Sequence, residues 1–243
     1  MTCSTGSSAG SASANNNSEP LAAVTRLRRD TAPRRRSAAV QTENRFVPVE
    51  LNSICVFCGS SPGRDPLYRQ QATALGGQLA RRGIRLVYGG GSVGLMGTVC
   101  DAVLDSGGQV TGVLPEFLAT RELQHFGVDD MRIVPDMHAR KALMASLSDA
   151  FIALPGGYGT LEELLEIITW AQLGLHRAGI GLLNTGGFYN PLIQLIDQAV
   201  EAGFVRAAQR ELLLVDDDPG QLLNRLAEYT PPSAEGWLRP EQT

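Results

Sequence analysis

The sequence predicts an α/β fold, a single Rossmann-like domain in which a doubly wound parallel sheet carries helices on both faces. Short apolar, β-branched runs alternate with segments of helical periodicity from Ile54 onward, which is typical of βαβ units. The runs are apolar at nearly every position, as expected of strands covered on both faces. Glycine-rich loops follow two of these runs, where α/β folds bind their ligands.

Seven strands are predicted from these runs, namely Ile54–Phe57, Ile84–Tyr88, Val110–Leu114, Met131–Val134, Ala150–Leu154, Ile180–Leu183 and Leu212–Val215. The helical segments between and after them are Leu67–Arg82, Met96–Leu104, His138–Leu147, Leu161–Leu173, Leu192–Ala202 and Leu222–Tyr229. No internal repeat or linker indicates a second domain, so we expect one domain over residues 51–230.

The segments outside this domain have a different composition. Residues 1–18 carry no charge and almost no bulky apolar side chain, so they cannot offset the entropy lost on ordering. We therefore predict a disordered N-terminal extension over residues 1–50 and a flexible tail over residues 231–243. The extension is also rich in serine and arginine and poor in acids, so an organelle transit peptide is the alternative to a cytoplasmic location.

Charge and composition restrict the classes of function. The 243 residues carry a net charge of −4, of which residues 1–50 contribute +3 and residues 51–243 contribute −7. An acidic body argues against nucleic-acid binding, which needs a basic surface. No run of ~20 apolar residues predicts a membrane span. Lys141 is the only lysine, so any Schiff-base chemistry would have to use it.

The first glycine loop follows the strand Ile84–Tyr88 and opens a helix. Glycines in such a loop let backbone amides approach a ligand, and the helix N-terminus adds positive potential. Residues 89–94 match G-x-G-x-x-G, and Glu116 ends the next strand, which is also the arrangement of a dinucleotide site. A tight turn without a ligand is the alternative interpretation.

The second glycine loop, residues 155–160, follows the strand Ala150–Leu154 and opens another helix. We expect that helix to bury a stripe of Leu161, Leu164, Leu165 and Ile168. The same stripe would leave its acidic residues on the other faces, namely Glu162, Glu163 and Glu166. Acids in a first turn are favoured by the helix dipole, but three beside a phosphate site would be costly unless one contacts a sugar or activates water.

Two basic residues open the helix that precedes the second loop. Arg140 and Lys141 lie at its N-terminal end, where the helix dipole disfavours cations. They are predicted either as counter-charges for a bound anion or as solvated surface residues.

Together these residues resemble the Lonely Guy family of cytokinin-activating nucleoside 5′-monophosphate phosphoribohydrolases. The family pattern PGGxGTxxE stands at residues 155–163, and its companion D-M-H-x-R-K stands at residues 136–141. The segments CVFCGS (residues 55–60), YGGGxVGLMG (88–97) and WAQLGLH (170–176) also match. The resemblance extends from about residue 54 to residue 229, without a departure in either main motif.

The resemblance implies hydrolysis of the N-glycosidic bond of N6-substituted adenosine 5′-monophosphates, which releases the base and ribose 5-phosphate. It implies a catalytic pair of Arg140 and Glu163, and a homodimer without metal or cofactor. The implied substrate contacts are Glu122, Lys141, Gly156, Gly157, Tyr158, Gly159, Thr160, Leu161 and Glu162. The first glycine loop would shape the pocket wall through Gly89, Gly90, Gly91, Gly94, Met96 and Gly97. The preferred base, prenylated or plain adenine, stays open.

Three other interpretations compete with this one. A nucleotide carrier without chemistry is the alternative, similar to the molybdenum-cofactor carriers of this fold. A nicotinamide-dependent oxidoreductase would use residues 89–94, but that loop follows the second strand rather than the first. A redox or zinc role for Cys55 and Cys58 is disfavoured, because residues three apart on a strand face opposite sides, which predicts buried reduced thiols.

Overall fold

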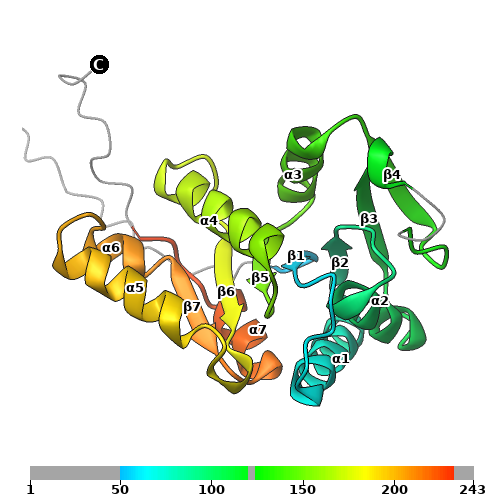
Figure 1. The fold of residues 1–243 in the computed structure, drawn as a ribbon, viewed down its shortest axis with the longest axis horizontal. Helices are drawn as coiled ribbons and strands as arrows, with labels where there is room; N and C mark the ends of the chain where they lie inside the picture. The colour runs from blue at the N-terminus through cyan, green and yellow to red at the C-terminus, as the bar shows by residue number, and fades with distance from the viewer. Residues whose placement is uncertain (1–49, 120–123, 233–243) are drawn as a thin grey trace, which may run out of the picture. The chain divides into compact units, whose positions relative to one another are not determined.

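The computed structural model describes residues 50–119 and 124–232, and they form a three-layer α/β domain around one parallel sheet (Figure 1). The strands lie in the order β4-β3-β2-β1-β5-β6-β7, and every neighbouring pair is parallel. The chain builds outward from β1 to β4 and then returns to the other side of β1 with β5. This reversal places the topological switch point between β1 and β5, as in a doubly wound fold.

Seven strands make up the sheet: β1 (Ser53–Phe57), β2 (Arg85–Tyr88), β3 (Val110–Pro115), β4 (Asp130–Val134), β5 (Ala150–Ala153), β6 (Gly179–Leu183) and β7 (Leu213–Asp216). The helices are α1 (Pro66–Arg81), α2 (Gly94–Asp105), α3 (Met137–Ser146), α4 (Tyr158–Gln172), α5 (Asn190–Glu201), α6 (Ala207–Arg210) and α7 (Pro219–Ala227). Two 3₁₀ turns, Glu116–Leu118 and Thr185–Gly187, follow β3 and β6.

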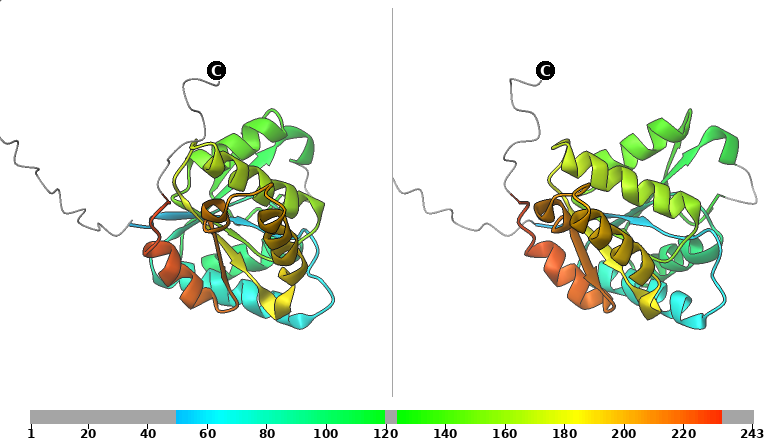
Figure 2. Two further views of the ribbon diagram at one scale, coloured as in Figure 1. Left: turned by 90° about the vertical axis from the view of Figure 1, so that its left-hand side faces the viewer. Right: turned by 60° about the vertical axis from the view of Figure 1, so that its left-hand side comes forward.

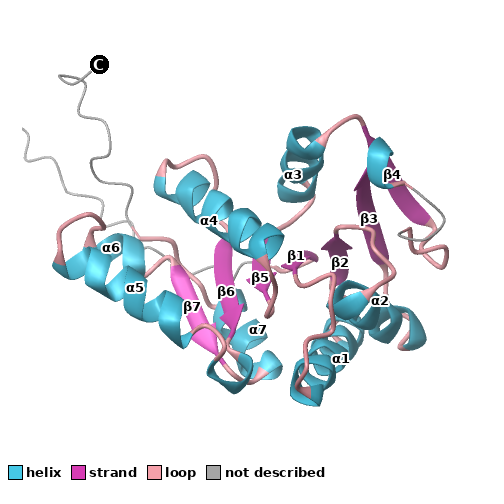
Figure 3. Ribbon diagram, in the orientation of Figure 1, coloured by secondary structure: helices cyan, strands magenta, loops and turns pink. Residues whose placement is uncertain are grey.

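The helices cover both faces of the sheet (Figures 2 and 3). One apolar cluster joins the strands to α1, α2 and α7, and it includes Leu75, Val99 and Leu222. The other joins them to α3, α4 and α5, and it includes Met144 and Leu164. The predicted fold class is therefore confirmed.

Each predicted strand agrees with the structure to within one residue at either end, whereas every predicted helix begins too late, by one to three residues. The first turns of these helices contain capping residues, prolines and glycines, so the helical spacing of apolar residues starts only after them. Asp65, Asp136 and Asp218 each accept a hydrogen bond from a backbone amide of the first turn. The four-residue helix α6 was not predicted, because it is too short to show a period.

The cysteines of β1 and its exit loop lie on opposite faces of the sheet. Cys55 belongs to the cluster under α3 and α4, and Cys58 belongs to the cluster under α1 and α2. Both are buried free thiols, and desolvation raises the pKa of each, with the Glu163 charge adding to the effect. The prediction of buried reduced thiols is confirmed.

Helices α1 and α2 pack closely at Gly76, which gives a testable contrast with its neighbour. A Cβ on Gly76 would lie 2.7 Å from the Ala102 Cβ and 2.7 Å from the Val99 carbonyl oxygen. A Cβ on Gly77 would meet only the flexible end of Arg81, at 3.1 Å.

We expect Gly76→Ala to lower the free energy of unfolding by about 1–3 kcal/mol, because added volume in a packed contact forces the helices apart. The matched variant Gly77→Ala should instead leave it unchanged or raise it by up to about 1 kcal/mol, since alanine is the better helix former. Urea unfolding of both variants checks this. Equal destabilisation by the two substitutions would show that the α1–α2 contact is not what requires Gly76.

Candidate active site

The candidate site lies at the carboxyl ends of β1 and β5, where the strand order reverses. The loops that leave these strands are bonded to each other. The Leu154 amide donates to the Phe57 carbonyl at 2.9 Å, and the Gly59 amide donates to the Pro155 carbonyl at 3.1 Å. Beyond this contact the β1 loop turns toward α1 and the β5 loop toward α4, so the two loops lie at the switch point, the place where this fold binds ligands.

The second glycine loop is tightly packed at its first glycine, Gly156, whereas a Cβ on Gly157 or Gly159 would point into open space. A Cβ on Gly156 would collide with the Thr160 hydroxyl and lie 2.9 Å from the Gly59 nitrogen. Gly157 caps α4, and Thr160 is buried inside its first turn. Tyr158 is 94% exposed at the helix start, and Leu161 is half-buried. The loop therefore places backbone amides at a helix N-terminus, as predicted from its glycines.

The first glycine loop meets the same β1 loop from the other side. Gly94 has a φ of +66°, and a Cβ there would run into the backbone of Ser60. The next amide, that of Leu95, donates to the Gly59 carbonyl at 3.0 Å. Gly59 thus contacts both glycine loops. The two motifs are far apart in sequence, but the structure brings them together on either side of the β1 loop.

The centre of the site is a buried ion pair between α3 and α4. The Arg140 Nη1 donates to the Glu163 Oε1 at 2.8 Å, and the Arg140 Nε donates to the Val113 carbonyl of β3 at 3.1 Å. The two side chains are only 10% and 9% exposed. The predicted catalytic pair is therefore brought together, and the guanidinium is held by strand β3 as well as by the carboxylate.

The burial of Glu163 corrects the expected face of α4. The helix buries Thr160, Glu163, Leu164 and Ile167, whereas Leu165 is 47% exposed. The predicted stripe that included Leu165 is therefore wrong, because the buried face is rotated toward Glu163. A carboxylate can occupy this position since Arg140 supplies the partner that a buried charge requires.

Burial also tunes the chemistry of Glu163. Desolvation raises its pKa above the usual value for glutamate, and the charge and hydrogen bond of Arg140 oppose this rise without cancelling it. A carboxylate with a raised pKa is a stronger base than an exposed one. It is therefore better suited to accept a proton from water near neutral pH.

Lys141 forms ion pairs with the other two acidic residues in the first turns of α4. Its Nζ donates to Glu162, and to the Glu166 Oε1 at 3.0 Å. Desolvation alone would lower the lysine pKa, but the two carboxylates outweigh it and the pKa is raised. The three acids that looked costly beside a phosphate site are therefore each paired with a cation, and Glu166 joins the site although it was not among the predicted contacts.

The remaining predicted residues fall into two groups. In the first loop, Gly89 lies against Arg140 and Met96 lies near Gly89. The other residues shape the loop itself: Gly90 packs against Met131, Gly91 pairs with Gln124, and Gly97 packs against Ser92. Glu122, in contrast, lies outside the described residues. The Val113 carbonyl was missed because a backbone acceptor leaves no signal in the sequence.

Gly89 gives a direct test of how the first loop serves the ion pair. A Cβ on Gly89 would collide with the Arg140 Nη2. Since Gly89 does not have a positive φ, alanine is allowed by its backbone. We expect Gly89→Ala to displace the guanidinium and to reduce turnover by about 10-fold or more, because small misplacements of reacting groups are costly. Steady-state kinetics would measure this, and a fully active variant would show that the guanidinium position is not critical.

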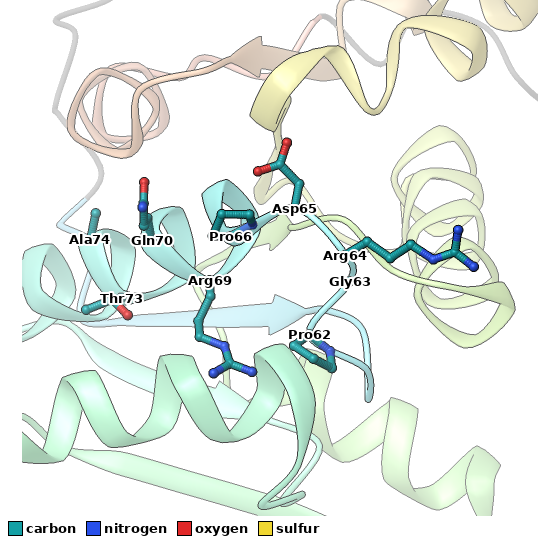
Figure 4. A pocket seen from close by; sticks show the side chains of 9 residues that line it. All are labelled: Pro62, Gly63, Arg64, Asp65, Pro66, Arg69, Gln70, Thr73 and Ala74. Atoms are coloured by element: carbon teal, nitrogen blue, oxygen red, sulfur yellow. The ribbon is translucent and has the colours of Figure 1, made fainter.

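Other features in the described part of the chain do not compete with this site. A hollow of about 690 Å³ runs along the N-terminal half of α1, lined by residues 62–66 and by Arg69, Gln70, Thr73 and Ala74 (Figure 4). None of the predicted site residues lines it. Within residues 50–119 and 124–232, no three His, Cys, Asp or Glu side chains are placed to hold a metal ion. No helix in these ranges is long and apolar enough to cross a membrane.

Comparison with known proteins places the chain in a family. A cytokinin riboside 5′-monophosphate phosphoribohydrolase of Arabidopsis thaliana is 56% identical over 182 residues, which cover 75% of this chain and 85% of that protein. One of Oryza sativa subsp. japonica is 51% identical over 189 residues, 78% of each chain. The chain belongs to the Lonely Guy family. The matching family model, described as "Possible lysine decarboxylase", covers residues 96–226.

Solved structures show the same fold at much lower identity. A molybdenum cofactor binding protein of Rippkaea orientalis has a TM-score of 0.55 and is 22% identical, over 72% of this chain and 95% of that protein. A molybdenum cofactor carrier protein of Chlamydomonas reinhardtii has a TM-score of 0.53 and is 24% identical, over 72% and 96%. At these identities the likeness establishes the fold of this Lonely Guy protein and nothing about its ligand.

Proposed function

We propose that this protein hydrolyses the N-glycosidic bond of N6-substituted adenosine 5′-monophosphates and releases the free base and ribose 5-phosphate. The observation that carries the proposal is the buried ion pair of Arg140 and Glu163 near the switch point of the sheet. The names of the relatives that are 51–56% identical support it independently.

We propose a division of labour among the site residues that is consistent with their geometry. Breaking the bond between C1′ and the base nitrogen builds positive charge on the ribose, which the Glu163 carboxylate stabilises while it accepts a proton from the attacking water. The departing base takes up a proton at its nitrogen from solvent, and the proton that Glu163 accepted from water returns to solvent, so the net reaction consumes one water. Arg140 holds Glu163 in place, and the amides of the second glycine loop at the α4 N-terminus bind the phosphate. Lys141 adds a positive charge near that loop.

The lysine decarboxylase label of the family model is not supported by this site. A lysine that forms a Schiff base must lose its proton, so its pKa has to be lowered. Lys141, the only lysine of the chain, instead has a raised pKa and contacts two carboxylates. Its contacts fit a charge that anchors acids or phosphate, and we propose no pyridoxal chemistry.

A nucleotide carrier without chemistry is the alternative to the hydrolase. The experiment that separates the two candidates compares isopentenyladenosine 5′-monophosphate, AMP and the unphosphorylated riboside. We expect free base from the monophosphates and none from the riboside, because the riboside lacks the phosphate that the glycine-loop amides would bind. Binding of the monophosphates without release of base would favour the carrier.

We further propose that the protein is a cytoplasmic homodimer. The proposal of a dimer is supported by three exposed leucines on α4 and the segment after it, Leu165, Leu173 and Leu175. Apolar side chains that gather on a surface are typical of protein–protein interfaces. Sedimentation should give twice the 26.0 kDa of one chain. Fluorescent fusions with and without residues 1–50 should both be cytoplasmic, and organelle targeting by the longer fusion alone would identify a transit peptide.

A further inference from the structure

His125 lies outside the predicted site residues, yet it is fixed from several sides. Its ring Nδ1 accepts a hydrogen bond from the Gly127 amide at 3.1 Å, and its Nε2 contacts the Asp101 Oδ1 of α2 at 2.9 Å. Because a backbone amide can only donate, the ring proton must lie on Nε2, which donates to Asp101. The His125 side chain is 13% exposed, so this tautomer is held in a largely buried place.

The same residue holds the first glycine loop. The His125 amide donates to the Gly90 carbonyl at 3.0 Å, and its neighbour Gln124 forms an antiparallel bridge with Gly91. Gly90 itself has a φ of +74°, which glycine adopts without strain and which other residues rarely adopt. The Asp101–His125 pair therefore ties the middle of the loop to helix α2.

The loop in turn limits where Arg140 can lie. Gly89 directly precedes Gly90, whose carbonyl accepts the His125 hydrogen bond, and it lies against the Arg140 Nη2 with no room for a Cβ. Arg140 donates from its other guanidinium nitrogens to Glu163 and to Val113. A shift of the loop would thus be transmitted to the guanidinium and from there to the Glu163 carboxylate.

We propose that His125, held by Asp101, is a positioning residue that fixes the first glycine loop against Arg140. It contacts neither Arg140 nor Glu163 and acts only through Gly90 and Gly89. The kinetic part of this inference rests on the proposed hydrolase function. The structural part, the holding of the loop, does not.

The test uses four variants of the full chain and a matched control. His125→Ala removes both ring contacts, whereas His125→Gln restores a donor for Asp101. Asp101→Ala removes the acceptor, and Asp101→Asn keeps an acceptor oxygen. The control is Asp105→Ala, an exposed acid one turn further along α2.

We expect amide exchange over residues 89–97 to accelerate in His125→Ala and Asp101→Ala, and to stay near the wild-type rate in His125→Gln, Asp101→Asn and the control. In His125→Ala and Asp101→Ala, kcat should fall roughly 10-fold, whereas KM should change less than about twofold. The reason is that the catalytic group is misplaced while the phosphate contacts remain. Combined with Gly89→Ala, the loss in His125→Ala should be less than multiplicative, since both act on Arg140.

Unchanged exchange over residues 89–97 in His125→Ala would overturn the proposal, whatever the kinetics. A glutamine variant as impaired as the alanine variant would also contradict it, as would fully multiplicative losses with Gly89→Ala. If the wild-type protein hydrolyses no nucleotide, the proposed function fails, but the exchange rates still decide whether His125 holds the loop.

Discussion

Glu163→Gln is expected to reduce kcat by about 10²–10⁴-fold, while affinity for the nucleoside monophosphate stays within a few-fold. Glutamine keeps the size of the side chain and can still accept a hydrogen bond from Arg140 through its amide oxygen. It cannot accept a proton from water or offer a negative charge to the ribose. The loss should therefore appear in turnover rather than in binding.

Single-turnover kinetics and calorimetric titration with AMP would measure the two quantities separately. The matched control is Glu201→Gln, an exposed glutamate at the end of α5, which should retain full activity. A Glu163→Gln variant with near wild-type turnover would remove Glu163 from the chemistry and leave it as the structural partner of Arg140.

Arg140→Met is expected to abolish turnover and also to lower the free energy of unfolding by about 3–5 kcal/mol at neutral pH. Methionine fills similar volume but leaves the buried Glu163 carboxylate without its partner. The double variant Arg140→Met with Glu163→Gln should regain much of the stability without regaining activity, because its buried group is no longer charged. Urea unfolding of both variants gives the comparison.

The pH dependence of Arg140→Met follows from the pKa of Glu163. In the native protein, burial raises that pKa and Arg140 opposes the rise. Without Arg140 the pKa should rise further. A carboxyl group with a raised folded-state pKa stabilises the fold below its unfolded pKa, and this contribution is lost as pH rises through the folded pKa. The stability deficit of the variant should therefore shrink on acidification. A deficit that grows at low pH would contradict this account.

The strands could be predicted from sequence because each is a short, mostly apolar run between breakers, and the inner strands are buried on both faces. The helix starts were predicted less well, since Tyr158 and Gly159 open α4 without any apolar period. The face of α4 was misjudged for a related reason. The apolar pattern alone predicts that Leu165 is buried and Glu163 exposed. The structure shows the opposite, because Arg140 on α3 supplies a partner for a buried Glu163.

The site itself was predicted mainly from its motifs. Glycine loops and the resemblance identified Arg140, Glu163 and Lys141, and the structure brings these three together with Glu162. Contacts that depend on tertiary placement were not accessible. Two such contacts are the hydrogen bond from Arg140 to the Val113 carbonyl and the one between Asp101 and His125. Each connects residues that are distant in sequence and that show no motif.

The most direct test of the proposed activity is product analysis with purified protein, isopentenyladenosine 5′-monophosphate and water, with no added metal or cofactor. We predict that free isopentenyladenine and ribose 5-phosphate accumulate in equal amounts, and that Glu163→Gln under the same conditions releases both at least about 100-fold more slowly. Nucleotide that stays bound but intact in the presence of the native protein would contradict the assignment of this chain as a phosphoribohydrolase.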